Sequence, residues 1–204
     1  MKTVLLSVHP NWLELILSGK KTVEVRKTKP KEAVPFRVLL YCTKGQLELA
    51  KDKSGNIVLL SRNKKADISD LEILSGKVIA EFVCDKIIDI DYGIEEGVFF
   101  DGKHQRGFET NGIGNNPTCL SFIDLENYLT NNEGYGWHIS DLKIYDKPKE
   151  LSEFRRKPCK FGRKGTICPF SCDKSGYSND MRSIVCFNTI DRAPQSWCYV
   201  RCEK

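Results

Sequence analysis

Three cations and one carboxylate fall close together near the start of the chain. Lys20 and Lys21 follow Gly19, and Glu24 and Arg26 alternate along the segment that comes next. Lysine and arginine donate charge-assisted hydrogen bonds to phosphate oxygens and to base edges. The cluster therefore predicts a site for RNA or a nucleotide, while a solvated turn is the simpler interpretation of Lys20 alone.

Two adjacent aromatic residues lie far along the chain from this cluster. Trp137 and His138 offer ring planes on which an unstacked base can lie. Core packing explains Trp137 equally well, and an inward position is the commoner one for Trp197 in a last strand. We expect Trp137 and His138 to complete the nucleic-acid site.

Four cysteines in residues 155–189 form a candidate metal site. They are spaced Cys-x8-Cys-x3-Cys-x13-Cys, at Cys159, Cys168, Cys172 and Cys186. The segment is basic and poor in apolar residues, and four thiolates on zinc supply the folding free energy that burial cannot. Cys198 or Cys202 is a rival fourth ligand, and a basic loop with incidental thiols is the alternative.

The elements that must position the first cluster are a helix and a strand. Residues 9–19 predict a short helix, with Pro10 at its first position and Gly19 just past its end. Residues 22–27 alternate as a strand, so Glu24 and Arg26 share one face. The lysine pair occupies the turn between these two elements.

The rest of the chain reads as many short strands with few helices. Further strands are predicted at residues 36–43, 46–50, 56–60, 76–90, 137–145 and 195–201, and short helices at 121–129 and 148–154. Residues 92–118 are rich in Gly and Asn and predict a long loop. Ser121 and Asp124 form a capping box for the first of these helices. The pattern indicates an α+β fold built on a mixed β-barrel.

Three segments resemble one family. Residues 17–26, Leu-Ser-Gly-Lys-Lys-Thr-Val-Glu-Val-Arg, resemble the signature of the ASCH domain, a branch of the PUA-like superfamily. Residues 135–145 and 194–200 look like segments of a phage- and bacterium-associated subgroup. The resemblance covers roughly residues 1–154 and 190–204, so residues 155–189 are an insertion.

The resemblance implies a PUA-like barrel whose cleft is lined by the Gly-Lys-Lys turn and the strand after it. RNA or nucleotide binding is the usual proposal for such clefts, and the match of Lys21 to the motif favours a functional role for it. The expected binding residues are Lys20, Lys21, Arg26, Trp137 and His138.

Hydrolysis is a second possibility that the resemblance raises. Some family members deacetylate a modified cytidine with a Lys, a Thr and a Glu. Lys21 matches the Lys, but Glu24 stands where the nucleophilic Thr is expected. A carboxylate can act as a base, yet it cannot replace a hydroxyl in the same acyl-transfer step. Lys21 and Glu24 are thus candidate catalytic residues, and a salt-bridged Glu24 that orients the cations is the simpler interpretation.

Charge and composition narrow the class of protein. Residues 1–37 carry a net charge of +5, residues 38–154 carry −7 and residues 155–189 carry +6. Two basic segments favour a polyanionic partner, and an acidic protein partner is a third possibility. No apolar run reaches membrane-spanning length and no signal-peptide core is visible, so we expect a cytoplasmic protein whose nine cysteines are not a disulfide framework.

The cysteine spacing leads to a prediction about metal. Protein purified without added metal should carry about one zinc ion per chain by elemental analysis. Removing the zinc should loosen residues 155–189 and leave the rest of the protein folded. Stoichiometric zinc that survives the double substitution Cys168→Ser and Cys172→Ser would show that the ligands lie elsewhere.

Overall fold

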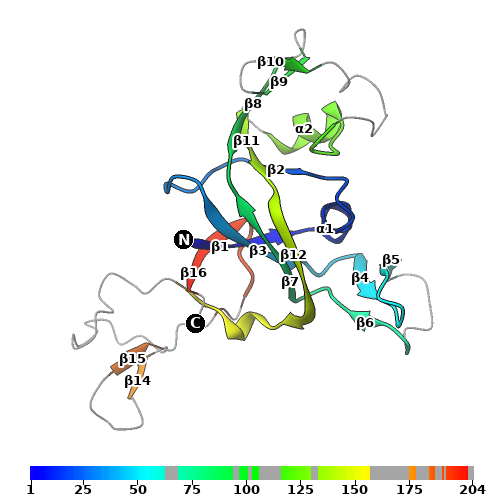
Figure 1. The fold of residues 1–204 in the computed structure, drawn as a ribbon, viewed down its shortest axis with the longest axis vertical. Helices are drawn as coiled ribbons and strands as arrows, with labels where there is room; N and C mark the ends of the chain where they lie inside the picture. Colours follow the sequence, from blue (N-terminus) through cyan, green and yellow to red (C-terminus); the bar gives the residue numbers. More distant parts are fainter. Residues whose placement is uncertain are drawn as a thin grey trace.

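The fold comes from a computed structural model of the chain. It describes residues 1–62, 69–93, 97–100, 103–105, 116–129, 133–156, 175–177, 184–186, 190 and 192–201. Within these ranges the chain is mostly strand, with two α-helices and one short 3₁₀ helix (Figure 1).

The larger sheet has six strands in the order β12-β7-β3-β1-β16-β13. Their bounds are β1 Thr3–Val8, β3 Phe36–Cys42, β7 Val78–Cys84, β12 Ser140–Lys149, β13 Arg155–Arg156 and β16 Trp197–Arg201. The central strands β1 and β3 are parallel, and the other neighbours are antiparallel. Every residue of β1 from Val4 to Val8 is buried, because both faces of this strand are covered.

The second sheet has five strands in the order β10-β9-β8-β11-β2. Their bounds are β2 Val23–Arg26, β8 Ile87–Gly93, β9 Gly97–Phe100, β10 Lys103–Gln105 and β11 Glu133–His138. All four residues of β2 are buried, including Glu24 and Arg26. The charged face of this strand therefore points into the molecule and not to solvent.

Two smaller sheets complete the strands. One has the order β5-β4-β6, with β4 Leu47–Lys51, β5 Ile57–Ser61 and β6 Glu72–Ile73; the other pairs β14 Ser175–Tyr177 with β15 Ile184–Cys186. The predicted hairpin at residues 46–60 is confirmed by the pairing of β4 with β5. Across the described part of the chain the strands form open sheets, and the closed barrel that was expected is not seen.

The helices begin where the sequence predicts. Helix α1 spans Pro10–Leu17 with Pro10 at its start, and Gly19 just past its end has φ +75°, a conformation that glycine adopts without strain. Helix α2 spans Phe122–Tyr128, and the Ser121–Asp124 capping box is present. The segment predicted as a helix at residues 148–154 is only a 3₁₀ turn, η1 Leu151–Glu153. No described helix has the length and apolar character needed to cross a membrane.

Two predicted strands turn out to be pairs of strands. Residues 76–90 divide into β7 and β8, and residues 137–145 divide between β11 and β12, with one member of each pair in each large sheet. The chain bends at Asp85-Lys86 and again at Ile139. The alternation is interrupted for only two residues at each place, by Asp85-Lys86 and by Ser140-Asp141, and so short an interruption does not distinguish one bent strand from two strands. The loop predicted at residues 92–118 also contains β9 and β10.

The main core lies between the two large sheets and α1. Trp137 is 0% exposed, and its ring meets Phe36 edge-on at 5.3 Å and Trp197 at 5.8 Å between centroids. Cys42 and Cys84 are also fully buried, as expected for small apolar side chains in strands. Burial raises the pKa of the Cys42 thiol to about 11 and that of Cys84 to about 12.

The burial of Trp137 gives a stability prediction. Replacing Trp137 with Ala should lower the free energy of unfolding by about 3–5 kcal/mol, because a large buried ring is lost and a cavity remains. Urea denaturation measures this change. Ile123→Ala is the control, since Ile123 is 64% exposed and its removal should cost little. A change below about 1 kcal/mol for Trp137→Ala would contradict its place in the core.

Candidate functional site

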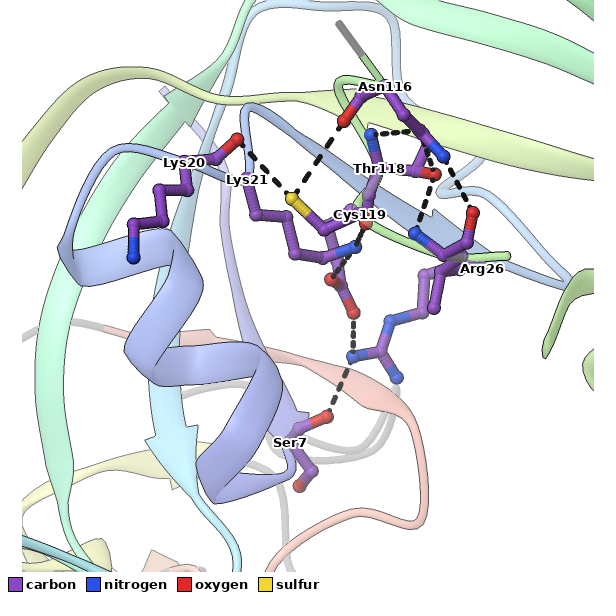
Figure 2. Close-up of polar contacts among 9 residues, drawn as sticks. Ser7, Lys20, Lys21, Arg26, Asn116, Thr118 and Cys119 are labelled. Atoms are coloured by element: carbon purple, nitrogen blue, oxygen red, sulfur yellow. Dashed lines mark hydrogen bonds and ion pairs between the residues drawn. The ribbon is translucent and has the colours of Figure 1, made fainter. Parts of the chain in front are cut away.

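Lys21 points into the protein from the turn between α1 and β2. Its backbone N–H donates to the Leu15 carbonyl, which ties the turn to the end of the helix. The side chain is 1% exposed, and Nζ donates to the Thr118 carbonyl oxygen at 2.5 Å (Figure 2). Nζ also lies 5.6 Å from the centroid of the Trp12 ring. A flexible lysine is therefore held in one place by contacts from three separate segments.

Glu24 joins Lys21 to Arg26. Its Oε2 lies 3.4 Å from Lys21 Nζ, and its Oε1 accepts a hydrogen bond from Arg26 Nη2 at 2.6 Å. Arg26 Nη2 also donates to the Ser7 carbonyl at the end of β1, at 2.8 Å. The three side chains are 1%, 7% and 9% exposed, respectively. We call Lys21, Glu24 and Arg26 the buried triad; its net charge is +1.

Burial and the carboxylate act on Lys21 in opposite directions. Loss of water around the ammonium lowers the pKa of Lys21 below its ordinary value of 10.5, and Glu24 partly offsets this shift by its charge and hydrogen bond. Arg26 adds to the lowering because it is a like charge. Burial therefore has the larger effect, and the pKa of Lys21 lies below its ordinary value despite the neighbouring carboxylate.

The end of the loop predicted at residues 92–118 supports the triad, a role that the sequence analysis did not assign to it. The Pro117 carbonyl accepts hydrogen bonds from the backbone N–H groups of Thr22 and Val23, which fixes the loop to the start of β2. Asn116 accepts from the backbone N–H and the hydroxyl of Thr118 and donates to the Leu120 carbonyl. These bonds aim the Thr118 carbonyl at Lys21. The Asn-Pro-Thr run was the available signal, because an Asn side chain before proline favours a tight turn.

One wall of a pocket is formed by the buried triad. The pocket has a volume of about 420 Å³, within the range of small-ligand sites. Its lining residues are Ser7, Val8, His9, Trp12, Lys21, Glu24, Val25, Arg26, Thr43, Leu120, Asp124, Asn127, Tyr128 and Gln195. They come from the end of β1, the first turn of α1, β2, the end of β3, α2 and the segment before β16.

The part of the chain that contains the buried triad is similar to a known family. Residues 6–93, which include the whole buried triad, match the model of the ASCH domain. Residues 6–93 are thus similar to the ASCH domain. No curated protein matches the chain.

One solved ASCH structure has a similar fold. This crystal structure of ASCH from Zymomonas mobilis superposes with a TM-score of 0.50 at 17% identity, over 98% of this chain and 88% of that one. A mutant ZmASCH protein from Zymomonas mobilis gives a TM-score of 0.43 at 18% identity, over 74% of this chain and 77% of that one. At 17% identity the likeness to the first structure concerns the fold alone.

The pocket beside the buried triad contains only part of the predicted site. Lys21 and Arg26 line it, and the candidate catalytic residues Lys21 and Glu24 are brought together. Lys20 is exposed, and Figure 2 shows its side chain directed away from Lys21 and Arg26. Both lysines were predicted to bind, with a solvated turn as the simpler interpretation of Lys20, and the exposed position of Lys20 agrees with that interpretation.

The predicted aromatic residues lie elsewhere. Trp137 has no ring face open to a base because its whole side chain is in the core, so the packing interpretation fits this residue. His138 is on the surface, where Nδ1 lies 2.7 Å from Asp85 Oδ1. The aromatic side chains that line the pocket are Trp12 and Tyr128. From the sequence, Trp12 was expected on the apolar face of the helix that is now α1. The residues around Tyr128 carry no pattern that identifies it as a pocket residue.

The predicted zinc site cannot be compared with the structure. Cys159, Cys168 and Cys172 lie outside the described residues, and of Cys186 only the backbone is described, at the end of β15. Among the described residues there is no group of three or more potential metal ligands. Zinc in residues 155–189 stays a prediction.

The pKa of Lys21 predicts a pH dependence of stability. A lysine whose pKa is lower in the folded state binds more protons when unfolded, so its contribution to stability rises with pH up to its ordinary pKa of 10.5. We expect the free energy of unfolding of the unmodified protein, minus that of Lys21→Met, to rise between the folded pKa and pH 10.5. Each unit of pKa difference is worth about 1.4 kcal/mol.

Urea denaturation of both proteins between pH 7 and 10.5 measures the difference. Subtraction cancels the titration of other groups, and Met keeps most of the lysine volume while Glu24 retains Arg26. A difference that does not change with pH would mean that Lys21 titrates as an exposed lysine does.

Proposed function

We propose that this ASCH domain binds single-stranded RNA or a nucleotide in the pocket beside the buried triad. The observation that carries the proposal is the net positive charge of that triad inside a pocket of about 420 Å³. A buried, uncompensated cation is costly in water-poor surroundings and gains most from an anionic partner.

The aromatic rings at the pocket support a nucleic acid as that partner. Trp12 and Tyr128 are partly exposed and line the pocket, so a base can stack on either ring. Lys27 Nζ lies 5.3 Å from the Tyr128 ring centroid, and Lys29 Nζ lies 4.3 Å from that of Tyr135. Lys27 extends the positive charge from the pocket along the surface near α2, where a phosphate backbone would follow, whereas Lys29 is paired with Asp89 at 3.5 Å.

Amide side chains at the pocket suit base recognition. Asn127 on α2 and Gln195 before β16 are exposed and line the same pocket. Each carries both hydrogen-bond donors and an acceptor, which is what reading the Watson–Crick edge of an unstacked base requires.

In this proposal Glu24 orients the cations and performs no chemistry. Its two oxygens are occupied, one by Lys21 and the other by Arg26. Hydrolysis of RNA or of a modified nucleoside remains the second candidate, favoured by the lowered pKa of Lys21.

The neighbouring lysines give a matched test of the proposal. Lys21→Met should weaken binding of a fluorescent, mixed-sequence single-stranded RNA by about 1.5–3 kcal/mol, the cost of one hydrogen bond to a charged group. Lys20→Met removes the same formal charge from an exposed side chain and should cost less than about 1 kcal/mol. Fluorescence anisotropy measures both, with thermal melts to verify folding.

Equal losses for the two variants, or none, would refute the pocket as the binding site. Mass spectrometry of the RNA after incubation separates binding from hydrolysis. Cleaved or modified RNA that appears with the unmodified protein and disappears with Lys21→Met would favour the hydrolase.

A further inference from the structure

Two donors in the pocket have no hydrogen-bond partner among the described residues. Among the described residues, the buried side-chain polar atoms without a hydrogen-bond partner are Arg26 Nε, Thr43 Oγ1 and Trp137 Nε1. Arg26 and Thr43 line the pocket. Buried polar groups are nearly always hydrogen-bonded, so two exceptions in one pocket call for an explanation. A bound ligand oxygen explains both.

The two side chains are anchored at the same end of β1. Arg26 donates to the Ser7 carbonyl, and the backbone N–H of Thr43 donates to the carbonyl of the next residue, Val8, at 2.9 Å. Helix α1 starts directly after this point, at Pro10. The unpartnered Nε and hydroxyl therefore belong to segments that meet where β1 passes into α1.

The first turn of α1 adds positive potential at this place. His9 is the N-cap residue but makes no side-chain cap, and the first bond of the helix runs from Leu13 N–H to the His9 carbonyl. Backbone N–H groups at the start of a helix carry a partial positive charge that favours anions. His9 and Trp12 from this turn both line the pocket.

The acidic side chains of the pocket are already engaged. Glu24 is shared by Lys21 and Arg26, and Asp124 accepts from the backbone and the hydroxyl of Ser121 in the capping box. The buried triad has a formal net charge of +1, and the exposed Asp124 brings the sum over the charged side chains of the pocket to zero. The buried pocket donors without a partner among the described residues are Arg26 Nε and the Thr43 hydroxyl. A ligand that complements them must bring several acceptor oxygens and a negative charge.

We propose that Arg26 Nε, the Thr43 hydroxyl and the first turn of α1 form a phosphate subsite. The inference rests on the proposed function and narrows its ligand to a nucleotide or RNA phosphate held against α1. Tyr128 and Asn127 on α2 are then left for the base. Thr43 is a specificity residue that distinguishes a nucleotide from its nucleoside.

Calorimetric titration of the full chain tests the subsite. The probes are the four common nucleosides, their 5′-monophosphates and inorganic phosphate. The monophosphates should bind more tightly than the nucleosides. Thr43→Val keeps the shape but removes the hydroxyl, and should reduce the ratio of monophosphate to nucleoside affinity roughly ten-fold, as expected for one hydrogen bond to a charged group. Thr43→Ser should restore the ratio.

The outcomes separate this inference from the proposed function. Nucleosides that bind as tightly as their monophosphates, with a ratio unchanged in Thr43→Val, would overturn the phosphate subsite and leave the pocket as the binding site. Inorganic phosphate that binds only when the hydroxyl is present, without affinity for any nucleoside, nucleotide or RNA, would support the subsite and overturn the proposed function. Absence of binding by every probe, together with no binding of the single-stranded RNA used to test the proposed function, would overturn both.

Discussion

The carboxylate of Glu24, held between two buried cations, is the interaction on which the site depends. It fixes Lys21 after α1 and Arg26 at the end of β2, and through Arg26 it reaches the end of β1. Desolvation of such a network costs about as much as the ion pairs return, so stability alone is a weak reason for its presence. A pocket beside it gives the better reason, because the surplus positive charge is available to a ligand there.

Local sequence signals predicted the elements around this interaction. The proline and glycine that bound α1, the alternation of β2 and the capping box of α2 act over a few residues, and each of these predictions is confirmed. Residues 76–90 were predicted as one long or bent strand, because a short interruption of the period-two alternation does not distinguish a bent strand from two strands. The division at Ile139 between β11 and β12 was missed for the same reason.

The site itself could be predicted only where it lies within one segment. Lys21, Glu24 and Arg26 are six residues or fewer apart, and their pattern already indicated a functional strand. Thr43, Tyr128 and Gln195 reach the same pocket from the ends of β3, α2 and the segment before β16. Only the pairing of the strands brings such distant residues together, and single-sequence patterns carry no information about that pairing.

Trp137 and Lys20 show that the type of a residue does not by itself predict whether its side chain lines the pocket. Both have the chemistry of nucleic-acid recognition, yet Trp137 fills the core against Phe36 and Lys20 is turned to solvent. What distinguishes Lys21 from Lys20 is the Thr118 carbonyl and Glu24, which hold its ammonium inside. Under the proposed function, the selectivity of the pocket comes from the partners that orient each cation, and a ligand would meet fixed donors whose desolvation was completed when the chain folded.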